Sequence, residues 1–206
     1  MRGALGEQTG KLRKGKGIRM ELQILHAIQG IHQGWLTEVM RFFTTIGESG
    51  LVWIVIAIVL TCIPKTRKCG LTIMIAMAVT YLVGNLFLKN MIARPRPCAV
   101  DTSVTLKIPF PSEYSFPSGH TSNGFAGAVT IFCYYHKAGI FCLLMAAVIA
   151  FSRLYFFVHY PTDILGGLIL GTLDALLAVY LVKRLEEHAE AQPEATKGKN
   201  DHTQEK

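Results

Sequence analysis

The sequence has few charged residues for its length, and acidic residues are the scarcer kind. Charged side chains make up 17% of the 206 residues, with 14 acidic against 21 basic. The acidic residues form no cluster in the loops of the kind that holds Mg²⁺. The five cysteines show no paired metal-ligand spacing, and in apolar surroundings they are ordinary small hydrophobic residues. We therefore expect an activity that uses neither a metal nor a cofactor.

Other features are also missing. The chain shows no internal repeat and no broken helices at mid-membrane depth, which would be expected of a transporter. Residues 1–19 carry six basic side chains but no apolar stretch of signal-peptide length, so they do not resemble a cleaved export signal. We interpret them as a basic N-terminal extension, with Met20 as an alternative start. The polar, charged residues 186–206 are expected to form a disordered tail.

Long apolar stretches account for most of the remaining chain, and hydrophobic residues make up 50% of it. Residues 69–88 include no charged side chain, and about 20 such residues cross a hydrocarbon core of about 30 Å. Residues 50–63, 138–158 and 162–182 are also apolar, the second of them interrupted by Arg153, and residues 119–135 form a shorter and more polar stretch. These segments predict five spanning helices.

A sixth crossing depends on residues 21–46, which are apolar but contain Glu38, Arg41 and two histidines. That pattern is closer to an amphipathic helix at the membrane surface than to a spanning helix. The sequence therefore predicts an all-α fold, a polytopic helical bundle in the membrane with five or six spanning helices, formed by residues 20–185.

We attribute the net charge of +7 to membrane topology rather than to nucleic-acid binding, which we do not expect. Basic residues fill the short loop at 65–68 and follow the last span at 183–184. The positive-inside rule places both segments in the cytoplasm. The loop over residues 89–118 is then predicted to face away from the cytoplasm, in a multi-pass protein of the cell membrane.

Charged side chains at the ends of three predicted spans are the strongest sign of function, because charges at membrane depth are costly. Lys89 ends the span at 69–88, and Arg94 and Arg96 follow it in alternation with two prolines. The prolines stop the helix and stiffen the segment. A snorkelling lysine beside a basic loop would explain this cluster taken alone.

The second cluster is Pro117-Ser118-Gly119-His120, which is typical of a helix start with Ser118 near the N-cap. A helix N-terminus binds anions, and Gly119 lets an anion approach the backbone closely. A simple cap before a span would account for the same residues, except that His120 adds a proton donor or acceptor near neutral pH.

The third cluster contains Arg153, His159 and Asp163, at the boundary between the last two spans. Pro161 places Asp163 in the first turn of the final helix, four residues after His159. The carboxylate is then within reach of one imidazole nitrogen, as in sites where a base is oriented by a third group. Alternate crossing of the spans delivers all three clusters to one side of the membrane.

Together the clusters resemble the three-part signature of the type 2 phosphatidic acid phosphatase superfamily, over residues 50–183. Its parts are Lys89 with six residues before Arg96-Pro97, then Pro117-Ser118-Gly119-His120, then Ser152-Arg153 with five residues before His159 and three before Asp163. All three parts are present, in order and at helix ends.

The resemblance implies that the phosphate is bound by Lys89, Arg96, Ser118, Gly119 and Arg153. It also implies that His159 attacks phosphorus, that Asp163 orients His159, and that His120 protonates the leaving oxygen. A phosphohistidine then forms and is hydrolysed. The residue types agree with this division of roles between phosphate binding and catalysis. Three fixed cations can neutralise the oxygens of a transferring phosphoryl group without a metal.

The implied function is hydrolysis of the terminal phosphate of a lipid phosphate or diphosphate by an integral-membrane enzyme. Undecaprenyl diphosphate is favoured by the compact size and the deduced non-cytoplasmic face. Phosphatidate or phosphatidylglycerophosphate is the alternative substrate, and a non-catalytic lipid-binding or transport protein is the alternative class. The expected partners are the lipid substrate and membrane lipids.

Several residues stand outside the signature. Arg94 would assist the phosphate or contact a lipid headgroup, and Asp174, within the last span, would form a buried hydrogen bond. Gly167 and Gly171 form a GxxxG pair that predicts close helix packing. Aromatic side chains near the clusters would line a lipid access path or act as interfacial anchors; they are Tyr114, Phe116, Tyr155, Phe156, Phe157 and Tyr160.

Overall fold

The computed structural model describes residues 2–200, and the side chains of residues 15–190 within that range, and this part of the chain contains helices and no strand. The predicted all-α class is confirmed. The elements are α1 (Arg2–Gln29), α2 (Gly34–Ile46), η1 (Glu48–Gly50), α3 (Leu51–Cys62), α4 (Arg67–Thr80), the π-helical η2 (Tyr81–Leu88), α5 (Lys89–Ile92), α6 (Pro97–Val100), α7 (Gly119–Tyr134), α8 (His136–Tyr155) and α9 (Pro161–Asn200).

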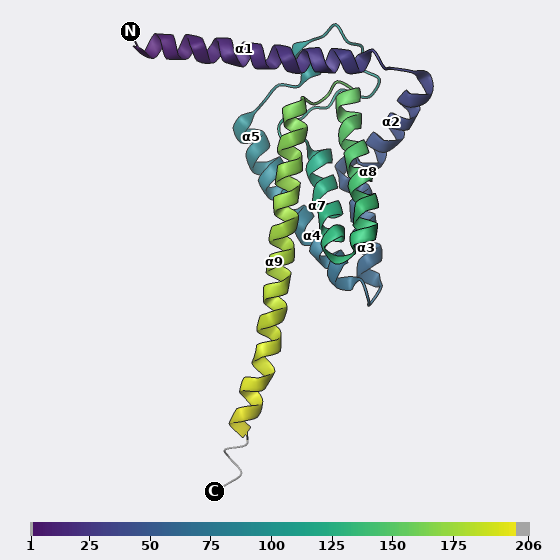
Figure 1. Cartoon of the computed structure of the whole chain (residues 1–206), viewed down its shortest axis with the longest axis vertical. Coiled ribbons are helices and arrows are strands. Elements are labelled where there is room, and N and C mark those ends of the chain that lie inside the picture. The colour runs from purple at the N-terminus through teal and green to yellow at the C-terminus, as the bar shows by residue number, and fades with distance from the viewer. Residues whose placement is uncertain (1, 201–206) are drawn as a thin grey trace.

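Helix α7 forms the centre of the bundle. It packs against α8, α9, α4 and α3, and the five helices stand side by side in Figure 1. Helix α1 lies across one end of the bundle, and α2 descends from that end toward α3. Helix α9 extends well beyond the opposite end.

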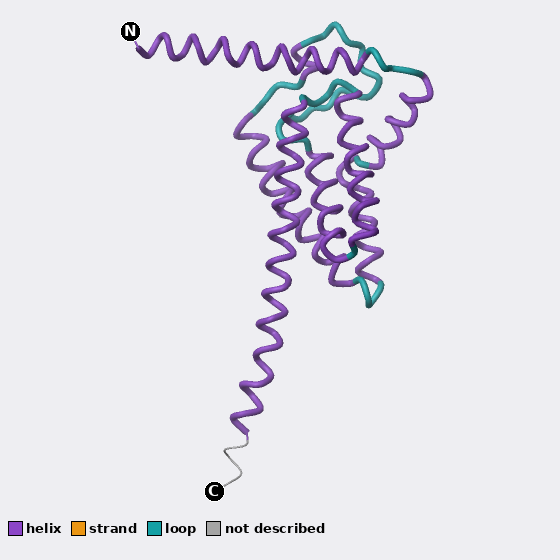
Figure 2. The backbone as a smooth tube through the Cα atoms, in the orientation of Figure 1, coloured by secondary structure: helices purple, strands orange, loops and turns teal. Residues whose placement is uncertain are grey.

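The loops divide between the two ends of the bundle (Figure 2). The long segment between α5 and α7 and the short turn between α8 and α9 lie at the end covered by α1. The α3–α4 loop and the α7–α8 junction meet at the other end, where the Tyr135 hydroxyl donates to the Lys65 carbonyl oxygen at 3.1 Å. Lys68 and Glu186 form an ion pair there at 2.9 Å. The basic segments at 65–68 and 183–184 therefore lie at the end opposite the three clusters.

Three described helical stretches are long and apolar enough to cross a membrane: Arg67–Val100, His136–Tyr155 and Pro161–Glu190. A fourth is present if Gly34–Ile46 and Glu48–Cys62, bent by 47°, count as one span. The 16 residues of α7 are too few to be counted alone, although α7 is surrounded by the others. The chain is thus a membrane protein, and the count of five or six crossings stays a prediction.

Small residues let α7 and α9 approach closely. A Cβ added at Gly171 would lie 2.1 Å from the Ser122 carbonyl oxygen, and one added at Gly167 would lie 2.7 Å from the Ser118 carbonyl oxygen. The predicted packing role of this GxxxG pair is confirmed. Asp174, one turn further along, accepts a hydrogen bond from the Thr80 hydroxyl of α4 at 2.8 Å, as its interpretation as a buried hydrogen-bonding residue requires.

We expect Gly171→Ala to lower the stability of the protein by about 1 to 3 kcal/mol, the usual cost of forcing extra atoms into a packed contact. The measurement is thermal unfolding in detergent. Gly34→Ala is the matched control, because nothing lies within 4 Å of a Cβ at Gly34. Equal melting temperatures for the two variants would contradict the close contact between α7 and α9.

The aromatic residues after Arg153 do not line a lipid access path. Tyr155, Phe156, Phe157 and Tyr160 are each at most 2% exposed and form a core cluster with Leu25 of α1. The interpretation of these four as access or anchor residues was wrong, because α1 covers the α8–α9 turn that carries them. Tyr114 is exposed, as that interpretation expected.

The two predicted terminal segments are only partly described. Residues 2–19 belong to α1, and residues 186–200 continue α9 beyond the point where the disordered tail was expected to begin. Residues 1 and 201–206 lie outside the described residues.

Candidate active site

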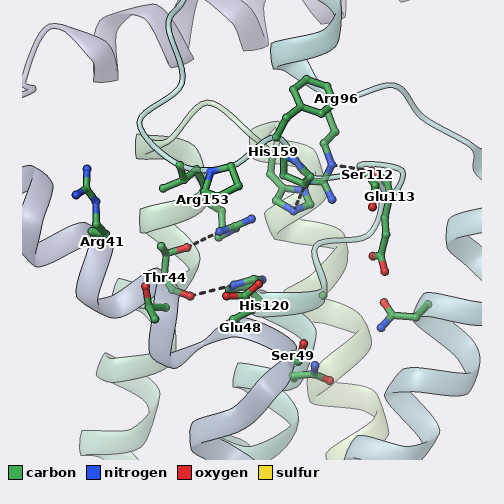
Figure 3. Close-up of a pocket in the computed structure, with 18 of the residues that line it drawn as sticks. Arg41, Thr44, Glu48, Ser49, Arg96, Ser112, Glu113, His120, Arg153 and His159 are labelled. Atoms are coloured by element: carbon green, nitrogen blue, oxygen red, sulfur yellow. Dashed lines mark hydrogen bonds between the residues drawn. The ribbon is translucent and has the colours of Figure 1, made fainter.

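The three clusters meet in one cavity of about 720 Å³ at the end of the bundle near α1 (Figure 3). Of the predicted site residues, six line this cavity: Lys89, Arg96, Gly119, His120, Arg153 and His159. Ser118 and Asp163 are fully buried behind its wall and do not line it. The lining also includes residues of α2 and of the loop at 107–113.

Arg96 is fixed by the stiff segment that carries it. Helix α5 ends at Ile92 and is followed by Ala93, which has a left-handed φ of 46°. Arg96 is extended, and Pro97 begins α6. The Arg96 Nε donates to the Glu113 carbonyl oxygen at 2.7 Å, and its Nη1 donates to the Val158 carbonyl oxygen at 3.0 Å. The same Nη1 lies 3.0 Å from His159 Nε2.

Arg153 projects from the last turn of α8 toward α2. Its Nη1 donates to the Thr44 hydroxyl, and its buried Nε has no hydrogen-bond partner among the described residues. Arg96 and Arg153 are each 6% exposed, and no described carboxylate lies within 4.0 Å of either guanidinium. Because a buried charge without a counter-charge is costly, this pair of guanidinium groups is suited to an anionic ligand.

Lys89 completes the group of cations, but it has a protein partner. Its Nζ donates to the Glu113 carboxylate, whose side chain is 63% exposed. This hydrogen bond holds the pKa of Glu113 below its ordinary value, so the carboxylate is ionised at neutral pH. Glu113 therefore occupies a hydrogen-bonding position of Lys89 at the cavity.

His159 presents one nitrogen to the cations and the other to Asp163. A guanidinium only donates hydrogen bonds, so His159 Nε2 accepts from Arg96 and the ring hydrogen is on Nδ1. Nδ1 lies 3.5 Å from Asp163 Oδ2, a long distance for a hydrogen bond but a close electrostatic contact. Burial lowers the pKa of His159 to about 3, and the neighbouring arginines lower it further against the opposing effect of Asp163. The ring is neutral, with its lone pair on Nε2.

Helix α7 supplies the remaining predicted residues. Ser118 is the N-cap residue, as expected, but its hydroxyl accepts from the Thr121 hydroxyl at 3.0 Å and does not cap the helix. The His120 Nε2 donates to the Thr44 carbonyl oxygen at 3.2 Å. Its Nδ1 makes no hydrogen bond within the described part of the chain, so this nitrogen is the one that can exchange a proton with a ligand.

Sequence reasoning missed two residues that hold this geometry. Thr44 contacts both Arg153 and His120, and it comes from the segment that we interpreted as an interfacial helix. Ser115 donates its hydroxyl hydrogen to Asp163 Oδ2. Neither has a local sequence signal, since a threonine in a helix and a serine in a loop are ordinary residues. In residues 15–190 no group of three His, Cys, Asp or Glu side chains is arranged to hold a metal ion.

Comparison with known proteins identifies the family of this chain. Residues 69–187 match the PAP2 superfamily. An undecaprenyl-diphosphatase of Sulfolobus acidocaldarius is 31% identical over 162 residues, which is 76% of this chain and 78% of the relative. Phosphatidylglycerophosphatase B of Bacillus subtilis is 32% identical over 171 residues, covering 76% and 78% of the two chains.

Solved structures show the same likeness. The crystal structure of a transmembrane PAP2-type phosphatidylglycerolphosphate phosphatase from Bacillus subtilis superimposes with a TM-score of 0.62 at 29% identity. The match covers 82% of this chain and 86% of that structure. The family match includes all three clusters, so the chain belongs to the PAP2 superfamily and is a membrane lipid phosphatase.

Proposed function

We propose that this phosphatase hydrolyses the terminal phosphate of a polyprenyl diphosphate such as undecaprenyl diphosphate, through a phosphohistidine at His159. The observation that carries the proposal is the pair of buried guanidinium groups, Arg96 and Arg153, which have no described carboxylate partner and lie beside a neutral imidazole. Fixed cations at that position stabilise the charge of a transferring phosphoryl group.

In the first step the Nε2 lone pair of His159 attacks the terminal phosphorus. The bond between phosphorus and the bridging oxygen breaks, and the leaving lipid phosphate takes a proton from Nδ1 of a protonated His120. Lys89, Arg96 and Arg153 neutralise the phosphoryl oxygens, and the Gly119 N–H at the N-terminus of α7 adds a hydrogen bond. Asp163 stabilises the positive charge that develops on the His159 ring.

In the second step a water molecule attacks the phosphorus of phosphohistidine. The now neutral His120 Nδ1 accepts the proton of that water, the P–N bond breaks, and its electron pair returns to His159 Nε2. Inorganic phosphate leaves, and both histidines return to their starting protonation states. The two steps need no redox partner, and charge neutralisation is supplied by the three cations.

The choice of a diphosphate rests on the cations at the cavity wall and on the similarity to an undecaprenyl-diphosphatase. Arg41 and Lys107 line the cavity in addition to the three signature cations, and Figure 3 shows Arg41 on α2 beyond Arg153. They are suited to the extra charge of a second phosphate. Phosphatidylglycerophosphate is the alternative substrate, which the similarity to the Bacillus subtilis enzyme favours.

The decisive experiment compares phosphate release by purified protein in detergent from undecaprenyl diphosphate, phosphatidylglycerophosphate, phosphatidate and a soluble sugar phosphate. We expect the highest kcat/KM for the diphosphate and unchanged turnover in excess chelator. A higher kcat/KM for phosphatidylglycerophosphate would replace the proposed substrate. Activity lost in chelator and restored by Mg²⁺ would contradict the mechanism.

We further propose five crossings and a catalytic face on the non-cytoplasmic side of the cell membrane. Helices α2 and α3 would form one bent span, followed by α4 with η2 and α5, then α7, α8 and α9. Helix α1 would lie along the membrane surface on the catalytic side. The basic residues at the opposite end support this orientation, since cytoplasmic loops are enriched in Lys and Arg.

Single-cysteine labelling of a cysteine-free variant tests this topology in intact cells. A cysteine at the exposed Thr105 is expected to react with a membrane-impermeant thiol reagent added outside the cell. A cysteine at the exposed Lys65 should react only after the membrane is opened. The reverse pattern would show that the catalytic face is cytoplasmic.

Replacing Glu113 by glutamine is expected to tighten binding of phosphate, because the carboxylate competes with phosphate for Lys89. A hydrogen bond to a charged group contributes about 1.5 to 3 kcal/mol, so the inhibition constant of inorganic phosphate should fall by about tenfold or more. Inhibition of p-nitrophenyl phosphate hydrolysis measures it. Glu187→Gln, which removes an exposed carboxylate paired with Arg184, is the control. Weaker inhibition in the Glu113 variant would contradict this competition.

A further inference from the structure

Arg94 lies outside the three-part signature, yet it is bound to two carboxylates. Its Nη1 is 2.6 Å from Asp163 Oδ1, and its Nη2 is 2.5 Å from Glu21 Oε2. The guanidinium also stacks on the Tyr160 ring, with Cζ 3.9 Å from the ring centroid. The Arg94 side chain is 20% exposed and does not line the cavity. These contacts leave no role for Arg94 as a direct ligand of the phosphate.

Asp163 depends on this arginine. Its side chain is completely buried, and Oδ2 accepts from the Ser115 hydroxyl and from the Tyr160 N–H at 2.8 Å. Oδ2 is also the oxygen that faces His159 Nδ1. Arg94 binds the other oxygen, Oδ1, and it is the one Lys or Arg side chain in residues 15–190 within 4.0 Å of this carboxylate. Burial disfavours the charged form of a carboxylate, and a neighbouring cation offsets that effect. Arg94 therefore helps to keep Asp163 ionised.

Glu21 connects the same network to helix α1. Its Oε1 accepts from the Thr162 N–H at 3.1 Å and from the Thr162 hydroxyl at 2.6 Å, while Oε2 accepts from Arg94. Thr162 belongs to the first turn of α9, directly before Asp163. Glu21 therefore binds an N–H group at the start of α9 and the cation that holds Asp163. Helix α1, which lies across the end of the bundle in Figure 1, brings it there.

We propose that Arg94 and Glu21 are positioning residues for the Asp163–His159 pair. Arg94 fixes Oδ1 of the ionised carboxylate so that Oδ2 faces the imidazole, and Glu21 fixes Arg94 and the first turn of α9. The N-terminal helix thus acts on catalysis through the contacts of Glu21 with Arg94 and Thr162, without contacting the substrate. The inference rests on the proposed function, because it assigns a purpose to the orientation of His159.

The test compares Arg94→Gln, Arg94→Lys and Glu21→Gln with wild type in detergent, using p-nitrophenyl phosphate as substrate and inorganic phosphate as competitive inhibitor. Loss of orientation should lower kcat of Arg94→Gln by about 100-fold. The KM and the inhibition constant of phosphate should change by less than about twofold, since the cations of the cavity are untouched. Arg94→Lys should recover part of kcat because it keeps the charge, and Glu21→Gln should fall between Arg94→Gln and wild type. Arg19→Gln, an exposed change on the same helix, is the control.

Each result decides for or against the inference. Wild-type kcat in Arg94→Gln, or a raised KM with unchanged kcat, would overturn it. If Arg94→Gln does not fold, the nearly isosteric Glu21→Gln decides, and wild-type kcat in that variant would also overturn it. A His159→Ala variant measured in parallel separates a failure of the proposed function from a failure of the positioning role. Turnover by His159→Ala would contradict the proposed function itself, whereas an inactive His159→Ala beside a fully active Arg94→Gln contradicts only the positioning role.

Discussion

His159→Ala is expected to release no phosphate above background from any substrate, because alanine has no atom that can accept phosphorus. Loss of a catalytic nucleophile typically costs about 10⁶-fold in kcat. The effect should be the same for a lipid diphosphate and for p-nitrophenyl phosphate, since both must pass through the covalent intermediate. The His159 lone pair is on Nε2, beside Arg96, and the alanine variant lacks that nitrogen.

His120→Ala should behave differently on the two substrates. General acid catalysis typically contributes about 10² to 10⁴, and an acid is needed chiefly when the leaving group is poor. Because p-nitrophenolate leaves with little help, His120→Ala should keep measurable activity on p-nitrophenyl phosphate while losing most turnover of the lipid. Equal collapse of the two histidine variants on the activated ester would contradict the assigned roles.

Arg153→Met should lower activity and raise stability at the same time. Removal of one group that stabilises the charge of a transition state costs about 10² to 10³ in kcat. The same guanidinium is 6% exposed and has no described carboxylate within 4.0 Å. Replacing buried charged groups by apolar ones of similar volume is often stabilising, by about 1 to 4 kcal/mol.

Steady-state kinetics on p-nitrophenyl phosphate and thermal unfolding in detergent measure the two effects on one preparation. Lys137→Met is the matched control, since Lys137 is an exposed cation at the other end of the bundle and should change neither quantity. A variant that is both inactive and strongly destabilised would contradict the account, because Arg153 would then hold the fold together rather than bind an anion.

The sequence was most informative where charges interrupt apolar stretches. Lys89, Arg153 and His159 stand at helix ends, and alternate crossing requires those ends to lie on one side, so their convergence follows from chain topology. Local sequence also indicates where helices begin, since Pro97 starts α6 and Pro161 starts α9. The short stretch that became α7 was also recognised, because its polar start at Ser118 directly precedes an apolar run.

The missed features depend on contacts between segments far apart in the chain. Thr44 and Glu21 come from the N-terminal region, and nothing near them in sequence indicates that they reach Arg153 and Arg94. The aromatic residues after Arg153 were misplaced for a related reason. A run such as Tyr155-Phe156-Phe157 has the same composition at a membrane surface and in a core, and only the position of α1 decides between them.

Trapping the covalent intermediate tests the central claim most directly. Wild-type protein and the His120→Ala and His159→Ala variants would be mixed with ³²P-labelled p-nitrophenyl phosphate in excess chelator, quenched in base and mapped by peptide mass spectrometry. We predict an acid-labile, base-stable phosphate on residue 159 in the wild type, more of it in His120→Ala, and none in His159→Ala. Phosphate on another residue, or labelling of the His159→Ala protein, would contradict the account.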